Sequence, residues 1–98
     1  MKLREHHLLR QPIIEMLRSG DHPSWEIEDE LARQFKVTDA ERALIQYGTC
    51  TVWRNDVAFG LKMLVESRTI GCIAKRRAPN GGTRGVYRLF RKEPEFPS

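Results

Sequence analysis

Apolar residues recur at helical spacing near the start of the chain. The set is Leu8, Leu9, Ile13, Ile14, Met16 and Leu17. Separations of three and four residues predict an amphipathic helix that ends before Ser19 and Gly20. Pro12 lies inside this pattern, so the helix either begins near Pro12, where a missing N–H is harmless, or continues through a kink from an earlier turn.

A second helical pattern follows Pro23. Ser24 is placed to be the N-cap of this helix. Acidic side chains in the first turns favour the positive end of the helix dipole, and these are Glu26, Glu28 and Asp29. The stripe expected to be buried consists of Trp25, Ile27, Leu31 and Phe35.

A third helix start is indicated by the spacing of Thr38 and Glu41. It is the spacing of a capping box, in which the two side chains satisfy each other's backbone N–H groups. We therefore expect a short helix from here to about Ile45. Residues 47–49, Tyr-Gly-Thr, then break the pattern, and a long helix is expected from about Thr51 to about Ser67.

The long helix has two faces of different chemistry. Its expected core face consists of Val57, Leu61, Leu64 and Val65. A polar stripe on another face consists of Thr51, Arg54, Asn55, Ala58 and Lys62. Two aromatic residues, Trp53 and Phe59, stand at helical spacing, which favours core positions over a role as stacking platforms for an unpaired base.

The period changes in the last third of the chain. Residues 70–75 alternate loosely, residues 78–83 read Ala-Pro-Asn-Gly-Gly-Thr, and residues 85–90 read Gly-Val-Tyr-Arg-Leu-Phe. This pattern predicts two short strands joined by a glycine-rich loop. The tail, residues 93–98, contains prolines and no periodicity, and we expect it to be disordered.

The predicted order is helix, helix, short helix, long helix and β-hairpin. It is the order of a winged helix-turn-helix, in which the long helix would be the recognition helix and the hairpin the wing. The predicted fold class is therefore mainly α with a small β-hairpin. A chain of 98 residues is near the common size of one domain, and we assign residues 1–92 to a single winged-helix domain.

Charge is distributed unevenly along this domain. The net charge of the chain is only +4, but residues 45–92 hold ten basic and two acidic side chains, whereas residues 21–44 hold three basic and seven acidic ones. Such polarity is expected when one face of a protein binds a polyanion. The alternative is that the basic residues only solvate a surface.

Candidate DNA-binding residues fall on the long helix and on the hairpin. On the helix they are Thr49, Thr51, Arg54, Asn55 and Ala58, with Lys62 further along. Arginine can pair with guanine and asparagine with adenine, while threonine and alanine can contact a thymine methyl group in the major groove. On the hairpin they are Lys75, Arg76, Arg77, Arg84 and Arg88, which suit phosphate contacts or insertion into the minor groove. For these five, charge protection of an edge hairpin is the alternative.

Signals for other kinds of site are weak. Cys50 and Cys72 are the only cysteines, and neither has a partner at a zinc-ligand spacing, so no metal or cofactor is predicted. No nucleophile, general base or phosphate loop stands in a catalytic context, so we expect no enzyme activity. No apolar run is long enough to span a membrane, and no signal peptide is visible, so a cytoplasmic location without membrane contact is expected.

From about Leu8 to Phe90 the sequence resembles the N-terminal domain of Mrr-type restriction system proteins. The matching segments are LLRQPIIEMLRSGD, WEIEDELARQFKVTDAER, RNDVAFGLKMLVES and RGVYRL. The resemblance implies a winged-helix module that binds duplex DNA and, in the wider family, is associated with modified DNA. The family pattern has a basic residue where Asp56 stands, an alanine where Gly60 stands and a glycine near Arg68. Family members commonly continue into a nuclease domain, and both an excised domain and a stand-alone protein fit this sequence.

A protein partner is the second functional hypothesis. Under it, the chain is a small phage-type inhibitor or adaptor that uses the winged-helix fold to block a nucleic-acid-handling complex. Its working face would be the acidic one, formed by Glu26, Glu28, Asp29, Glu30, Asp39 and Glu41. The sequence leaves the oligomeric state open, a homodimer included.

Overall fold

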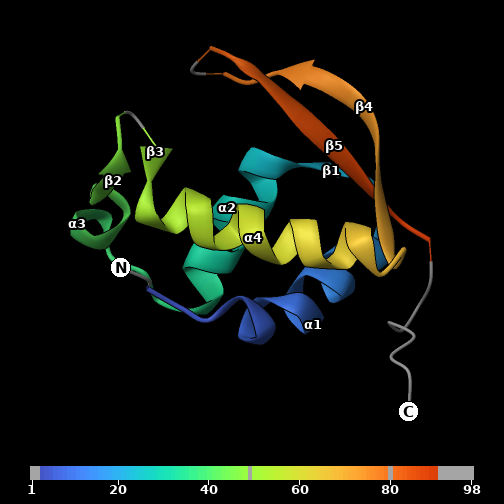
Figure 1. Cartoon of the computed structure of the whole chain (residues 1–98), viewed down its shortest axis with the longest axis horizontal. Coiled ribbons are helices and arrows are strands. Elements are labelled where there is room, and N and C mark those ends of the chain that lie inside the picture. The colour runs from blue at the N-terminus through green and yellow to red at the C-terminus, as the bar shows by residue number, and fades with distance from the viewer. Residues whose placement is uncertain (1–2, 49, 80, 91–98) are drawn as a thin grey trace.

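The computed structural model describes residues 3–48, 50–79 and 81–90, and they form an α+β fold with a small antiparallel sheet (Figure 1). The elements in chain order are α1 (His6–Arg18), β1 (His22–Pro23), α2 (Ser24–Gln34), α3 (Asp39–Arg42), β2 (Ile45–Tyr47), β3 (Cys50–Thr51), α4 (Val52–Glu66), β4 (Ile70–Arg77) and β5 (Thr83–Leu89). The predicted tail, residues 93–98, lies outside the described residues. No helix in the described ranges has the length and apolarity needed to cross a membrane.

The three longer helices pack on one another, and the long hairpin lies on the other side of α4 from α1 (Figure 1). Its closed end, where β4 turns into β5, extends over the N-terminal half of α4. The short hairpin β2–β3 lies beside the N-terminus of the same helix (Figure 1). Two hairpins therefore border the first turns of α4.

The sheet has the strand order β1-β5-β4, with both pairings antiparallel. Only the β4–β5 hairpin was expected from the sequence. The added strand β1 is two residues long, and Pro23 in it pairs with Val86. Because a strand this short has no detectable period, its pairing depends on the docking of α1 and α2 against the hairpin.

The core is formed mainly by the apolar stripes predicted for the helices. Fully or nearly fully buried residues include Leu9, Ile13, Ile14, Leu17, Ile27, Leu31, Trp53, Val57, Leu61, Leu64 and Ile70. Two expectations on α4 are wrong, because Phe59 is 46% exposed and Val65 is 38% exposed. With Val57 and Leu61 pointing inward, a residue two positions on from Val57 is rotated by about 200° and faces outward.

Helix α1 begins well before Pro12 and continues through it, which agrees with the second of the two predicted alternatives. The expected N-cap of α2 is wrong. The chain is still extended at Pro23, which is held in the sheet by β5, so Pro23 is the cap and Ser24 is already the first helical residue. Ser24 Oγ is buried and has no hydrogen-bond partner among the described residues.

The capping box at α3 is confirmed. Thr38 N donates to Glu41 Oε1 at 3.0 Å, and Glu41 N donates to Thr38 Oγ1 at 3.1 Å. The hydrogen bond that the Glu41 carboxylate accepts from Thr38 N holds the pKa of Glu41 below its usual range. The helix ends at Arg42 rather than near Ile45, because the chain there enters strand β2 and pairs with β3.

The predicted limits of α4 are confirmed. Thr51 is the N-cap, and its Oγ1 accepts a hydrogen bond of 3.1 Å from Arg54 N, while Ser67 is the C-cap. The buried residue Asp56 ties the N-terminal segment to this helix. Its Oδ2 accepts hydrogen bonds from the backbone N–H groups of Leu3 at 2.8 Å and Arg4 at 3.2 Å. The helix is thus anchored at its start and along its inner face.

Candidate nucleic-acid interface

The polar stripe of α4 is only partly exposed. Arg54, Ala58 and Lys62 are exposed. Thr51 is half-buried and engaged as the helix cap, and Asn55 is half-buried with its amide 3.5 Å from Gln46 Oε1 on β2. The predicted contact Thr49 lies outside the described residues.

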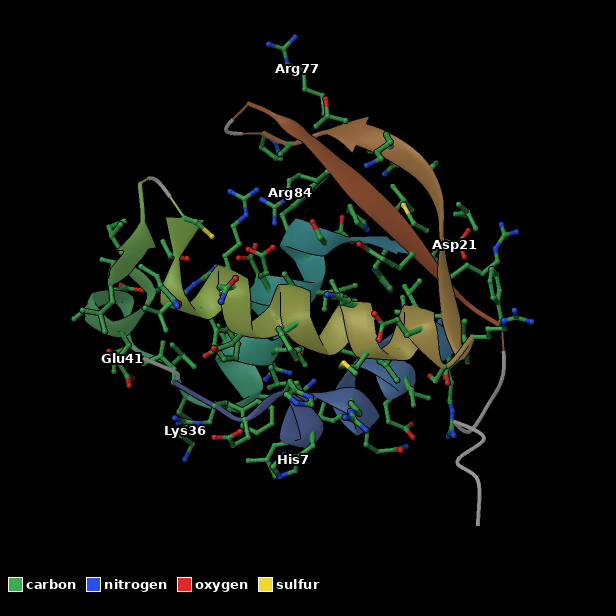
Figure 2. The ribbon with its side chains drawn as sticks, in the orientation of Figure 1. His7, Asp21, Lys36, Glu41, Arg77 and Arg84 are labelled. Carbon is green, nitrogen blue, oxygen red and sulfur yellow. The ribbon has the colours of Figure 1, made fainter. Side chains whose placement is uncertain are left out.

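Strand β4 carries three consecutive exposed cations, Lys75, Arg76 and Arg77. Successive side chains on a strand point to opposite faces, so the set presents charge on both sides of the hairpin. Arg77 extends from the closed end of the hairpin away from the body of the protein (Figure 2). Within the described residues, none of the three has an ion-pair partner.

Arg84 does not belong to this exposed set. It faces α2 and forms an ion pair with Glu28, with the two side chains only 14% and 11% exposed (Figure 2). The ion pair leaves little of the Arg84 side chain exposed, so a phosphate contact at this position would require the pair to open. The arginine is directed inward because a buried carboxylate, 56 positions earlier in the chain, needs a partner.

Arg88 also has a different environment from the one predicted. It lies in register with Gly71, at the open end of the hairpin rather than at its tip. Its Nη2 and Nε donate to both carboxylate oxygens of Asp21 at 2.9 and 3.1 Å, which holds the pKa of Asp21 below its usual range. The guanidinium joins the α1–β1 turn to β5 and is not part of a basic cluster at the tip.

Carboxylates of the acidic segment are mostly neutralised inside the molecule. Four of them pair with basic side chains: Glu26 with His22, Glu28 with Arg84, Asp29 with Arg42 and Glu30 with Arg33. Glu41 is occupied in the capping box. Five of the six residues of the acidic surface that the sequence predicted, all but Asp39, are therefore engaged in ion pairs or hydrogen bonds with other described residues, while the cations of α4 and β4 are exposed to solvent.

A hollow of about 180 Å³ separates the start of α4 from the hairpin. Its lining includes Glu28 from α2, Arg54 and Ala58 from α4, and Thr83 and Arg84 from β5. Burial raises the pKa of Glu28, and the charges of Arg84 and Arg54 act in the opposite direction. The helix and the hairpin thus border one concave region, and this brings Arg54 to the same side of the molecule as the hairpin cations.

Three features of this region were not expected from the sequence. Strands β2 and β3 place Gln46 beside Asn55, and Ile45 next to it is 57% exposed. Glu28 was expected to favour the helix dipole and to lie on an exposed acidic face, and its role as a buried partner of Arg84 was missed. An acidic residue within an otherwise apolar helical stripe, next to Ile27 and three positions before Leu31, is the signal that could have indicated burial.

No group of three or more His, Cys, Asp or Glu side chains among the described residues is arranged to hold a metal ion. Comparison of the chain with known proteins found no matching family model, no matching curated protein and no matching solved structure.

Proposed function

We propose that this chain is a winged-helix module that binds duplex DNA through α4 and the β4–β5 hairpin and has no catalytic site of its own. The element order and the strand order β1-β5-β4 support this architecture, because they place a hairpin next to the third long helix. The observation that carries the proposal is the contrast in charge pairing among the described residues: Glu28, Asp29 and Glu30 have ion-pair partners, whereas the cations of α4 and β4 form no ion pair there.

In this proposal the two elements have different tasks. The N-terminal half of α4 enters the major groove, where Arg54 and Ala58 are free to meet base edges and Asn55 can do so after releasing Gln46. Lys75, Arg76 and Arg77 contact phosphates or the adjacent minor groove. Phosphate contacts set the position of the protein on DNA, and base contacts set the preferred sequence.

Three departures from the Mrr-type pattern have a simple structural account. Arg68, where the pattern has a nearby glycine, adopts a positive φ of 59°, a conformation that glycine favours. Gly60, where the pattern has alanine, has room for a Cβ atom at ordinary contact distance. Asp56 replaces a basic residue, and here it binds the N-terminal backbone.

The alternative function, a small inhibitor or adaptor that binds a basic protein, has less support. It requires acidic side chains that are free to meet a partner. Pairing of Asp29 with Arg42 and of Glu30 with Arg33 lowers the charge available on that face. We therefore place DNA first.

The proposal is tested by fluorescence anisotropy with a labelled duplex at several salt concentrations. If about three to four phosphates are contacted, log K against log salt will have a slope of about −3 to −4. Arg77→Ala will reduce the slope by about one, while Arg88→Ala, which changes the net charge equally, will leave it unchanged because Arg88 is held by Asp21. Absence of binding at low salt would refute the proposal. The same titration with a methylated duplex measures any preference for modified DNA.

A further inference from the structure

We propose that Glu28 is a positioning residue, which holds α4 and the β4–β5 hairpin at the spacing that lets both meet one DNA duplex. The inference rests on the proposed function and adds to it the element that sets the geometry of the interface. Glu28 lies on α2, which is not part of the proposed contact surface. Glu28 nevertheless interacts with both elements of that surface, with α4 through its carbonyl oxygen and with the hairpin through its carboxylate.

The main chain of Glu28 holds the start of α4. Trp53 Nε1 donates a buried hydrogen bond of 3.0 Å to the carbonyl oxygen of Glu28. Trp53 is the second residue of α4 and directly precedes Arg54, so this bond fixes the end of the helix that would enter the groove. The indole is almost completely buried, which leaves it little freedom to tilt.

The side chain of Glu28 holds the hairpin. Its carboxylate pairs with Arg84, and Arg84 lies directly opposite Arg76 in the β4–β5 register. Pairing of β5 with β1 extends toward the tip only as far as Val86. Beyond that point the ion pair attaches the hairpin to α2, close to the three exposed cations of β4.

Electrostatics alone and positioning make opposite predictions for Glu28→Gln. Removing a carboxylate near the interface makes it more positive, so electrostatics alone predicts tighter DNA binding. Positioning predicts weaker binding, because glutamine cannot neutralise the buried Arg84 and the hairpin is released. The sign of the change therefore decides between the two accounts.

The experiment compares Glu28→Gln with Glu30→Gln in the full chain by anisotropy with the same duplex. Glu30 lies on the same helix, and its side chain is 30% exposed in its pair with Arg33 against 11% for Glu28, so it controls for the loss of one negative charge. We expect Glu28→Gln to bind about tenfold more weakly than wild type. Glu30→Gln should bind equally well or slightly better. Equal or tighter binding by Glu28→Gln would overturn the proposal.

Arg84→Lys is the second variant. It tests the same ion pair without changing the net charge, and it can be measured even if Glu28→Gln does not fold. It preserves the net charge but shortens the reach to Glu28, so electrostatics alone predicts no change in affinity. Positioning predicts a loss similar to that of Glu28→Gln. Wild-type affinity in a folded Arg84→Lys protein would contradict the proposal even if Glu28→Gln failed to fold.

Amide hydrogen exchange provides a readout that does not depend on DNA. In both variants, exchange should become faster in the half of β4–β5 near the tip and stay at the wild-type rate in α1. Unchanged exchange in the hairpin would refute the positioning role. If the wild-type protein binds no duplex, the proposed function fails, and the exchange comparison still reports whether Glu28 holds the hairpin.

Discussion

At the scale of single residues, backbone conformation separates Lys36 and Arg68 from the rest of the described chain. They are the non-glycine residues there with positive φ, 55° and 59°. Each follows the C-cap of a helix, and the next residue closes the end with a bond across five positions: Val37 N to Ala32 O at 2.9 Å, and Thr69 N to Leu64 O at 3.0 Å. This is the geometry of a Schellman motif, in which glycine is the favoured residue.

We predict that Arg68→Gly raises the free energy of unfolding by about 0.5–1 kcal/mol, because it removes the steric cost of a left-handed residue. Glycine also raises the conformational entropy of the unfolded chain, and this offsets part of the stabilisation. Urea unfolding followed by circular dichroism measures the change. Lys62→Gly, at an exposed position inside α4, is the control and should lower stability by about 1 kcal/mol. A destabilised Arg68→Gly would mean that the side chain of Arg68 contributes more than its backbone costs.

At the scale of elements, α1 and α4 come close together at Gly60. A Cβ atom added there would lie 3.5 Å from Ile13 Cδ1, 3.6 Å from His6 O and 3.7 Å from Leu9 Cβ. These are ordinary van der Waals distances, so the two helices leave space for one methyl group but not for a branched side chain.

Gly60→Ala is therefore expected to stabilise the protein by about 0.5–1 kcal/mol, since alanine loses less backbone entropy than glycine in a helix. Gly60→Leu should have the opposite effect, a loss of about 1–3 kcal/mol, because its larger side chain would force α1 and α4 apart. Thermal unfolding monitored by circular dichroism measures both. If alanine and leucine destabilise the protein alike, α1 and α4 are too close together at Gly60 to leave space for a methyl group.

At the scale of the whole molecule, the separation of base contacts from phosphate contacts can be measured. Arg54→Ala should lower the preference between a good and a poor site by about 1–3 kcal/mol, because a base contact discriminates between sequences. Arg77→Ala should weaken binding to both sites equally, because a phosphate contact does not. A preferred duplex is first selected from a random pool, and both variants are then titrated against it and against a scrambled duplex.

A charge-matched control completes this comparison. Arg88→Ala removes the same charge as Arg77→Ala from the opposite end of the hairpin and should change neither affinity nor preference appreciably. If Arg54→Ala keeps the full preference while Arg77→Ala loses it, then the hairpin selects the sequence and the assignment of α4 as recognition helix is wrong.

The sequence by itself determined the local features of this protein. The Thr38 and Glu41 capping box, both ends of α4, the β4–β5 hairpin and most of the core stripe are present as predicted. These features depend on residues a few positions apart, whose spacing matches the period of a helix or strand. Such interactions form within one element, so the linear pattern contains the information needed to predict them.

The tertiary structure decided which charged residues are free. Arg84 and Arg88 looked equivalent to Arg76 and Arg77 in the sequence, but Glu28 and Asp21 bind them across 56 and 67 positions. The outward position of Phe59 and the pairing of β1 were decided in the same way, by the packing of whole elements. Spacing along the chain does not specify contacts between elements. A carboxylate is attracted to the nearest cation in space, and only the assembled helices and hairpin determine which cation that is.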